Sequence, residues 1–424
     1  MQTSLTNSSY SSHVSRCRLC GSEAFFDQQL KLKPTALANE LYLTHSEALQ
    51  ADEFALTLVM CAMCKHIQLS EAVTSKRLFD SYVYTSSTSS SFRTHFNELA
   101  ETIGELLNPS ASILEVGSND GYLLSVLQGK GFRCLGLEPS SILVEHSRQL
   151  GIDVHQGYLD GKNVSEIIDS HGHFDCIVGN NVFAHIPDLA LAIRQVEVLL
   201  KDGGLFVIEV AHAVEILRKG IFDTIYHEHH SYHTLLALRP FLESLGFGLI
   251  AVEGVPTHGG SLRIVARKDS TSNTEEVSRI EKMEQELGFD EPEVFQAMEE
   301  RIEKSQSDFL RALEEAGDSV IFGYAAPAKV VTFLYQVCEN PEKIQFIIDD
   351  NLMKQGKFLP GLGVPVVGAS HLKNVLKEAS GRKMTCFVFA WNLSDELRSK
   401  MKLMLPDGSE IVSFFPALTK EIIA

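Results

Sequence analysis

Short apolar segments alternate with longer amphipathic ones through the middle of the chain, and this alternation limits the possible folds more than any other feature. Strand-like apolar runs occupy Ile113–Val116, Cys134–Leu137, Cys176–Gly179 and Leu205–Val210, with helix-like stretches between them. Strands joined through helices pair in parallel with right-handed crossovers. We therefore predict an α/β unit with a parallel sheet over residues 85–268.

Differences in composition and hydrophobic pattern divide the rest of the chain into further units. Residues 16–84 are loop-rich with clustered cysteines, residues 269–317 are acidic and helix-like, and residues 318–424 again alternate apolar runs with a helix-like segment. A chain of 424 residues exceeds the ~100–200 residues of one ordinary domain. We predict a small N-terminal domain, the central α/β unit, a long linking helix and a second, smaller α/β unit, after a disordered polar tail at residues 1–15.

The charge and hydropathy of the chain argue against nucleic acid and membrane as partners. The chain has 37 Lys and Arg against 55 Asp and Glu, a formal charge of −18 that repels a phosphate backbone. No uncharged apolar run approaches the ~20 residues that span a bilayer, and the polar first residues lack the apolar core of a signal peptide. We expect a cytoplasmic protein with a small-molecule substrate, which binds neither nucleic acid nor membrane.

Two C-x2-C pairs mark the N-terminal region. Cys17 and Cys20 form the first pair and Cys61 and Cys64 the second, and each pair can supply half of a tetrahedral zinc site. Four thiolates leave no open position for water, so we predict a structural zinc ion. His66 is a competing ligand, and four ordinary core or free cysteines are the plain alternative. The other cysteines are expected in the core: Cys134, Cys176, Cys338 and Cys386.

A glycine-containing turn follows the first strand of the central unit. The run from Ile113 to Gly121 places an apolar strand before Gly117-Ser-Asn-Asp-Gly121, after which a helix begins. This arrangement brings backbone close to a ligand at the carboxyl edge of a sheet. Glu138 ends the next strand, where an acidic side chain can accept hydrogen bonds from ribose hydroxyls, so the ligand should contain a nucleoside. A solvated strand-end acid is the alternative for Glu138 alone.

The same turn distinguishes between nucleoside cofactors. Asn119 stands where a dinucleotide fingerprint has its second glycine, and Asp120 would repel a pyrophosphate. S-adenosylmethionine lacks phosphate and carries a cationic sulfonium, so it fits better. The run from Phe174 to His185 looks like the fourth strand of a class I methyltransferase, and Leu199–Glu209 matches that fold's turn into strand five. We assign the cofactor to Glu115, Gly117, Ser118, Asn119, Gly121, Glu138, Asn180 and Asn181.

A cluster of aromatic and ionisable residues follows the fifth strand. Tyr226-His-Glu228-His229-His230 combines histidines with a carboxylate, in a region that class I methyltransferases use for substrate. A histidine near its ordinary pKa of ~6.5 can take a proton at physiological pH, and a carboxylate can hold its tautomer. The cluster is typical of a base with an orienting group. Hydrogen-bonded core or surface histidines remain an alternative, as does a His/Glu metal site, although no His-x3-His pair accompanies the run.

The order of these motifs resembles that of the nucleotide-sugar C-methyltransferases, which add a methyl group to a ketodeoxysugar. The cysteine pairs, Tyr82-Val-Tyr84, the Gly117–Gly121 turn and the Tyr226–His229 run occur in the family's order. The resemblance implies an N-terminal zinc domain, a central S-adenosylmethionine domain and a C-terminal Rossmann-like domain. The C-terminal loop that ends in Lys329 also looks like the family's, although Ala325 and Val330 stand where the family tends to have glycine.

The resemblance also implies a reaction and residues for it. His229 would remove the proton α to a ketone, Glu228 would orient it, and Tyr226 and Tyr84 would donate hydrogen bonds to the enolate oxygen. The resemblance further places three residues on the substrate, namely Tyr82, His258 and Lys329. An O- or N-methyltransferase of the same fold, or a non-catalytic zinc-containing binding protein, are the competing hypotheses. Neither the sugar nor the methylated carbon follows from the sequence.

Overall fold

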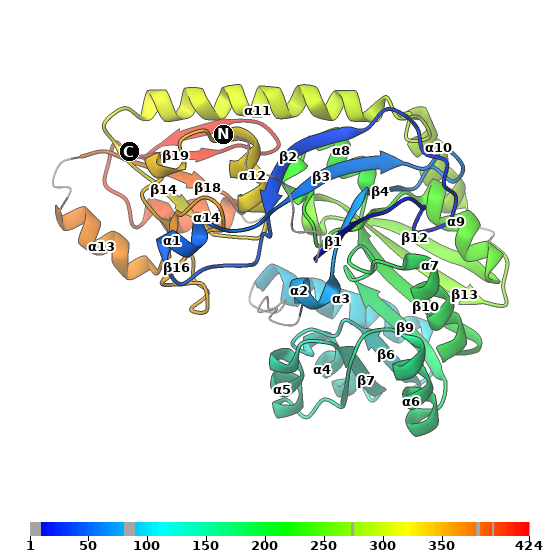
Figure 1. Ribbon diagram of the computed structural model, residues 1–424. Helices are drawn as coiled ribbons and strands as arrows, with labels where there is room; N and C mark the ends of the chain where they lie inside the picture. The colour runs from blue at the N-terminus through cyan, green and yellow to red at the C-terminus, as the bar shows by residue number, and fades with distance from the viewer. Residues whose placement is uncertain (1–9, 80–89, 273–274, 379–381, 392–393, 424) are drawn as a thin grey trace.

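The computed structural model describes residues 10–79, 90–272, 275–378, 382–391 and 394–423 (Figure 1). Two seven-stranded sheets, one four-stranded sheet and a two-stranded ribbon form its β-structure within these ranges. No helix in the described ranges is long and apolar enough to cross a membrane. The architecture is α/β, as the alternation of segments predicted.

The central sheet has the strand order β12-β13-β10-β9-β6-β7-β8. Its strands are β6 (Ser112–Val116), β7 (Arg133–Glu138), β8 (Val154–Gln156), β9 (Phe174–Asn180), β10 (Leu200–Ala211), β12 (Phe247–Val255) and β13 (Ser261–Lys268). The first five are parallel, whereas β13 pairs antiparallel with both β10 and β12. The four strand-like runs predicted from the sequence lie within β6, β7, β9 and β10, and the prediction of a parallel sheet is confirmed.

The strand order creates a switch point beside β6. The chain moves outward from β6 through β7 to β8, then returns to the other side of β6 with β9 and β10. Ligands of open α/β sheets bind in the crevice at the carboxyl ends of the strands at such a point. All five residues of β6 are buried, because helices cover both faces of the sheet. These helices are α3 (Ser90–Leu106), α4 (Tyr122–Gly129), α5 (Ser141–Gln149), α6 (Gly161–His171), α7 (Leu189–Leu199) and α9 (Leu235–Ser244).

The N-terminal unit contains a sheet that a distant segment completes. Its order is β11-β4-β3-β2, where β2 is Leu30–Ala36, β3 is Glu53–Met60, β4 is Ile67–Leu69 and β11 is Ser231–Tyr232. Strand β11 belongs to the run that contains His229, so the N-terminal sheet ends on that run. The unit also contains β1 (Ser11–His13), α1 (His45–Ala48), β5 (Glu71–Val73) and α2 (Ser75–Phe79). Because β1 pairs with β5, the end of the tail predicted at residues 1–15 is ordered, contrary to the prediction. The predicted boundary at residues 84 and 85 lies outside the described residues.

The C-terminal sheet has the order β16-β17-β15-β14-β18-β19-β20. It is built from β14 (Val320–Tyr324), β15 (Ile347–Ile348), β16 (Lys357–Phe358), β17 (Pro365–Val367), β18 (Met384–Val388), β19 (Glu410–Ser413) and β20 (Thr419–Ile422), with helices α12 (Lys329–Val337), α13 (Ala369–Glu378) and α14 (Ser394–Lys402). The five inner strands are parallel, and the edge strands β16 and β20 are antiparallel. This sheet confirms a second Rossmann-like unit.

Two helices, rather than one, connect the two large sheets. α10 (Glu275–Glu286) and α11 (Val294–Ala316) are separated at Gly288, which has a φ of 76°. The apolar stripe of α11 is buried, including Phe295 and Phe309, and it joins one hydrophobic cluster with side chains of β2, β3 and α12. Figure 1 shows α11 passing along both the N-terminal strands and the C-terminal unit. The three units therefore share a core.

Candidate active site

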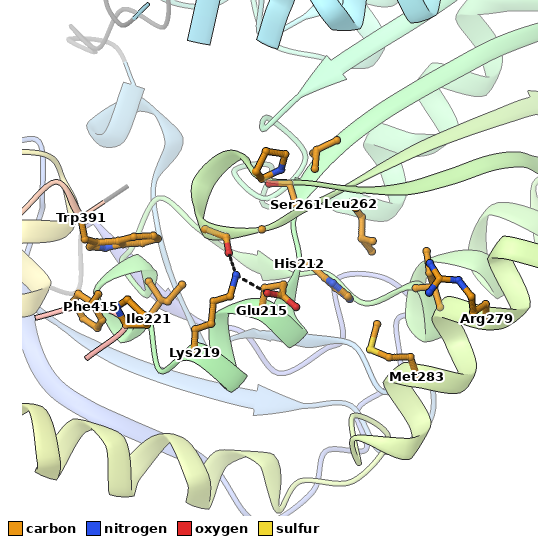
Figure 2. A pocket seen from close by; sticks show the side chains of 17 residues that line it. His212, Glu215, Lys219, Ile221, Ser261, Leu262, Arg279, Met283, Trp391 and Phe415 are labelled. Carbon is orange, nitrogen blue, oxygen red and sulfur yellow. Dashed lines mark hydrogen bonds and ion pairs between the residues drawn. The ribbon is translucent and has the colours of Figure 1, made fainter. Parts of the chain in front are cut away.

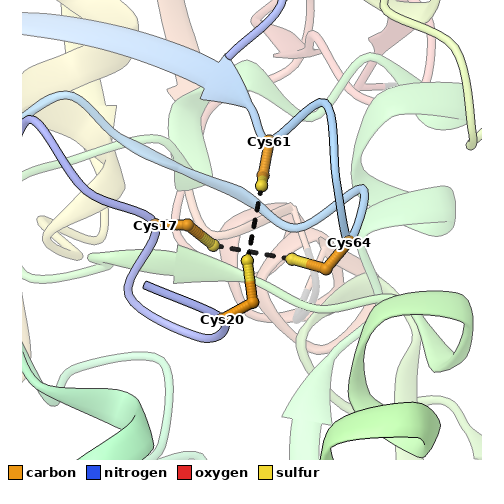
Figure 3. Close-up of side chains that lie close together, drawn as sticks. All are labelled: Cys17, Cys20, Cys61 and Cys64. Carbon is orange, nitrogen blue, oxygen red and sulfur yellow. Dashed lines mark hydrogen bonds between the residues drawn. The ribbon is translucent and has the colours of Figure 1, made fainter. Parts of the chain in front are cut away.

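The four cysteines of the N-terminal unit lie together, as the C-x2-C spacing predicted (Figure 3). Cys17 Sγ is 3.5 Å from Cys64 Sγ, Cys20 Sγ is 3.6 Å from Cys61 Sγ, and all four sulfur atoms lie within 4.8 Å of one another. A tetrahedral zinc ion with Zn–S bonds of ~2.3 Å requires sulfur atoms about 3.8 Å apart. The cluster is therefore close to the size that a zinc ion requires.

Matching turns bring the cysteines to this position. Gly21 and Lys65 each follow the second cysteine of a pair, with φ values of 75° and 64°, and their amides donate to the carbonyls of Cys17 and Cys61. The hydrogen bond with Cys64 lowers the pKa of Cys17 to about 5, so one thiolate is present at neutral pH. His66, the competing ligand, instead lies with Nε2 3.1 Å from the Ser231 hydroxyl.

The loop between β6 and α4 is shaped for close approach of a ligand. Gly117 has a φ of 67°, and a Cβ atom there would lie 2.7 Å from Val182 Cγ2. Gly121 has a φ of 75°, and a Cβ atom there would lie 2.9 Å from Ser147 Oγ. Glycine alone adopts such backbone without strain. The loop is held close to the β9–α7 connection, so the carboxyl ends of β6 and β9 form one edge.

Glu138 ties this loop to the end of β7. Its Oε2 accepts a hydrogen bond from the Asn119 amide at 3.0 Å, and its Oε1 accepts one from the Ser140 amide at 2.9 Å. Burial raises the pKa of Glu138, while the two amides lower it. The carboxylate therefore stands at the crevice beside β6. Its hydrogen bonding to ribose remains a prediction.

Three buried polar atoms at this edge have no hydrogen-bond partner among the described residues. They are Glu115 Oε2 on β6, Ser118 Oγ in the loop and Asn180 Nδ2 at the end of β9. Burial, with the nearby charges of Asp120 and Glu138, raises the pKa of Glu115 well above its ordinary value. Such groups are normally satisfied, so this edge is suited to a polar and cationic ligand. S-adenosylmethionine, with its sulfonium and ammonium groups, meets that requirement.

The β9–α7 connection joins this edge to the histidine run. Asn181 has a φ of 54° and its amide donates to the Glu209 carbonyl at 2.8 Å, which turns the chain at the end of β9. Four residues later, the ring of His185 lies 4.9 Å from that of His229. The residues predicted for the cofactor and the predicted base therefore border one region of the molecule.

His229 has a defined tautomer. Its Nδ1 lies 2.7 Å from the carbonyl oxygen of Thr224, and a carbonyl only accepts, so Nδ1 carries the proton. The other ring nitrogen, Nε2, then holds the lone pair. Burial lowers the pKa of His229 to about 4, which keeps the ring neutral at physiological pH. The Tyr226 ring lies 4.1 Å from the imidazole.

Glu228 does not orient His229, contrary to the role inferred from the sequence. Its Oε1 accepts a hydrogen bond from Asn39 Nδ2 at 2.7 Å, and the Thr224 carbonyl takes the orienting role. Consecutive side chains leave the backbone in different directions, so adjacency in sequence does not place the carboxylate on the ring. Burial raises the pKa of Glu228 to about 7.

A second group of polar residues lies where the C-terminal unit meets the central unit. Trp391 Nε1 donates to Asp223 Oδ2 at 2.8 Å, and the Lys329 ammonium lies 4.3 Å from the centre of the Trp391 ring. Burial raises the pKa of Asp223 to about 6 and lowers that of Lys329. Burial and the charges of Lys329 and His229 lower the pKa of His258 to about 3, so His258 lies within electrostatic range of both.

The sequence matches known methyltransferase families. The methyltransferase domain family matches residues 91–252, and the C-methyltransferase C-terminal domain family matches residues 256–416. The C-methyltransferase NovU of Streptomyces niveus is 28% identical over 411 residues, which cover 95% of this chain and 96% of that protein. The chain is therefore a methyltransferase, homologous over almost its whole length to a C-methyltransferase.

Two solved methyltransferase structures overlap with this chain over less than half of its length. Magnesium protoporphyrin IX methyltransferase (ChlM) from Synechocystis PCC 6803 is 15% identical, with a TM-score of 0.34, and covers 42% of this chain and 83% of its own. The CurJ carbon methyltransferase is 17% identical, with a TM-score of 0.35, and covers 43% of this chain and 56% of its own. The fold assignment rests on the strand order of the central sheet.

Most of the predicted site residues lie in the loop after β6, at the ends of β7 and β9, and in the run that contains His229. Tyr82 and Tyr84 lie outside the described residues, so their roles stay predictions. Sequence reasoning missed His185, Asp223 and Trp391. His185 ends the run assigned to the fourth strand, and Trp391 is the single tryptophan of the chain, directly after a strand-like run. These positions could have indicated His185 and Trp391 from the sequence, whereas no local motif indicates Asp223.

A cavity of about 590 Å³ lies beside this region (Figure 2). It is bordered by α8 (Ala213–Lys219), α10, the turn between β12 and β13, and Trp391 of the C-terminal unit. The Lys219 ammonium donates to the Gly259 carbonyl at 2.6 Å and pairs with Glu215. The turn joins β12 and β13 as an antiparallel hairpin. None of the residues predicted for the cofactor or for the base lines the cavity.

Proposed function

We propose that this methyltransferase adds a methyl group to the carbon α to a ketone of a nucleotide-linked deoxysugar, through an enolate that His229 generates. The observation that carries this proposal is the tautomer of His229, whose Nδ1–H is held by the Thr224 carbonyl at 2.7 Å. That bond makes Nε2 the nitrogen that accepts a proton. The substrate class is supported by the order of motifs, which resembles the nucleotide-sugar C-methyltransferases.

Carbon methylation requires a carbon nucleophile. An unactivated C–H bond does not attack a sulfonium, whereas the carbon beside a ketone becomes nucleophilic when its proton is removed. Neutral His229 is in the form that can remove it, because burial lowers its pKa to about 4. The developing enolate is negative, and its charge would stabilise the imidazolium as it forms. A positioned base of this kind contributes about 10²–10⁴-fold in rate.

Hydrogen-bond donors would stabilise the enolate oxygen. Tyr226 lies against His229, with ring centres 4.1 Å apart, and we assign its hydroxyl to that oxygen together with Tyr84. Removing one such donor from an oxyanion site costs about 3–4 kcal/mol in the transition state. Lys329 supplies a cation near His229 that is suited to a phosphate of the acceptor.

The remaining groups position the cofactor and stabilise the fold. S-adenosylmethionine, when bound, supplies an electrophilic methyl group on a positively charged sulfur. The Gly117–Gly121 loop, Glu138 and the unpaired atoms of Glu115 and Asn180 would hold it at the carboxyl ends of β6 and β9. We assign zinc to the four cysteines in a structural role, because a closed set of four thiolates leaves no position for a substrate.

Exchange of the α-proton tests the proposal directly. A nucleotide-linked ketodeoxysugar incubated with the protein in D2O should gain deuterium, and the gain should disappear in His229→Ala. His146→Ala, which removes an exposed histidine of α5, is the matched control and should exchange normally. A screen of nucleotide sugars by mass spectrometry should then identify the acceptor by its methyl gain. Normal exchange by His229→Ala, or a methyl gain on oxygen or nitrogen, would contradict the proposal.

A further inference from the structure

We propose that Asn39 is a positioning residue for methyl transfer, which holds Oε1 of Glu228 so that Oε2 is the oxygen offered to the acceptor. The proposal rests on the function proposed above, since it assigns Glu228 to the acceptor site. It also gives the N-terminal unit a part in the reaction. The contact joins residues 189 positions apart, and nothing in either sequence motif indicates it.

The hydrogen bond distinguishes the two oxygens of the carboxylate. Asn39 Nδ2 donates to Oε1 at 2.7 Å, a distance typical of a bond to a charged acceptor. Oε2 is buried and has no hydrogen-bond partner among the described residues. A buried carboxylate oxygen without a partner is costly, so it is normally satisfied by a group that binds there. A hydroxyl of the acceptor has the required donor.

The backbone around Asn39 is fixed, which a positioning residue requires. The Glu40 amide donates to the Leu37 carbonyl at 3.1 Å, and the Leu41 amide donates to the Asn39 carbonyl at 3.1 Å, so the segment forms a tight turn. Ala38 is buried in the core shared by the three units. On the far side of the turn, Arg77 pairs with the Glu40 carboxylate.

The run that contains Glu228 is attached to the same unit on both sides. His227 Nε2 lies 3.3 Å from the Phe54 carbonyl oxygen and 3.2 Å from that of Ala55. On the other side, the Leu69 amide donates to the His230 carbonyl at 3.0 Å, and β11 pairs with β4. The backbone segments that carry Asn39 and Glu228 are therefore attached to the same unit, which keeps the two side chains within hydrogen-bond distance.

The charge of Glu228 depends on groups from two other units. Asn39 in the N-terminal unit and the Lys354 ammonium in the C-terminal unit both lower its pKa, whereas burial raises it. On its own element Glu228 lies between His227 and His229, which burial keeps neutral at physiological pH. Loss of the Asn39 donor therefore favours the protonated acid.

A substrate-free titration tests the contact. The carboxyl band of Glu228 can be assigned by infrared difference spectroscopy as the band that Glu228→Gln removes, and titrated between about pH 5 and about pH 9. Asn39→Ala should raise its midpoint by about one pH unit or more, since a hydrogen bond to a charged group contributes ~1.5–3 kcal/mol. Asn374→Ala, which removes an exposed asparagine of α13, should leave the midpoint unchanged. An unchanged midpoint in Asn39→Ala would overturn the proposal.

A double-mutant cycle tests the positioning role during turnover. With a nucleotide-linked ketodeoxysugar, Asn39→Ala and the isosteric Asn39→Asp should each lower kcat by about 10- to 100-fold, the range expected for small misplacements. In the Glu228→Gln background the same changes should have almost no further effect on kcat, because the group through which Asn39 acts is gone. Equal losses in both backgrounds, or a loss explained by a lower melting temperature, would overturn the role.

The two experiments separate this inference from the proposed function. If no nucleotide-linked ketodeoxysugar is turned over by the wild-type protein, the proposed function fails, and the infrared titration still decides whether Asn39 controls Glu228. If the sugar is turned over and the cycle is additive, the proposed function stands and the positioning role fails.

Discussion

Lowering the pH is expected to destabilise the protein through His227, a histidine that the fold keeps neutral. The side chain is buried against the carbonyl oxygens of Phe54 and Ala55, and burial lowers its pKa to about 4. In the unfolded chain the pKa returns to ~6.5. The native state therefore binds fewer protons than the unfolded state between these values. Stability is fully present above about pH 6.5 and is lost as the pH falls toward 4.

The size of the effect follows from the difference in pKa. At about pH 5 the pH lies about 1.5 units below the pKa of His227 in the unfolded chain, where the native side chain is still neutral. Protonation then stabilises the unfolded state by roughly 2 kcal/mol relative to the native state. The entropy of unfolding is ~2.1 cal/mol/K per residue, so this free energy corresponds to a melting temperature about 2 °C lower for a chain of 424 residues.

The measurement compares wild type with His227→Gln. Glutamine keeps an N–H donor for the same carbonyls and does not titrate, so its melting temperature should fall by about 2 °C less than that of the wild type between about pH 7.5 and about pH 5. Asp223 and Glu228 have raised pKa values and contribute with the opposite sign, but both proteins contain them. Identical pH dependence in the two proteins would refute the reasoning.

Four further predictions concern the metal content, cofactor affinity, stability and turnover of the protein. Purified protein should contain about one zinc ion per chain by metal analysis, and Cys61→Ser should lose that ion and unfold the N-terminal unit, whereas a zinc-free wild type would exclude the site. Glu138→Ala should weaken S-adenosylmethionine binding about 10- to 100-fold by calorimetry, and unchanged affinity would remove the ribose assignment. Ala325 has a φ of 65°, so Ala325→Gly should raise the free energy of unfolding by up to about 1 kcal/mol in urea, and a decrease would mean that the strain is absent. His229→Ala should lower kcat by about 10²–10⁴-fold while cofactor affinity stays nearly constant.

The strands of the central sheet were predictable for a physical reason. β6, β7, β9 and β10 are covered by helices, so their sequences are continuous apolar runs that stand out from the amphipathic helices between them. The same reasoning fails for short strands. The apolar run Ile344–Ile348 forms a strand only at its last two residues, and β11, also two residues long, carries no periodic signal.

Some features of the site follow from local sequence, whereas others depend on contacts between residues far apart in the chain. The cluster of four cysteines follows from C-x2-C spacing, because each pair is a local turn, and the loop between β6 and α4 follows from one strand and the turn after it. The Asn39–Glu228 contact and the Trp391–Asp223 contact join residues 189 and 168 positions apart. Such pairs are set by how the units dock. For the same reason, the orienting group of His229 could not be identified before the backbone path from Thr224 was known.

Strand β11 has a consequence for attempts to exchange parts between related enzymes. Because Ser231 and Tyr232 form the edge of the N-terminal sheet, a chimera that takes residues 16–84 from one parent and the rest from another would pair a foreign β4 with the native β11. A mismatch of register there would shift the chain that leads to His229. A chimera is therefore expected to fold and be active only when residues 222–233 come from the same parent as the N-terminal unit, although some 140 residues separate the two segments in the chain.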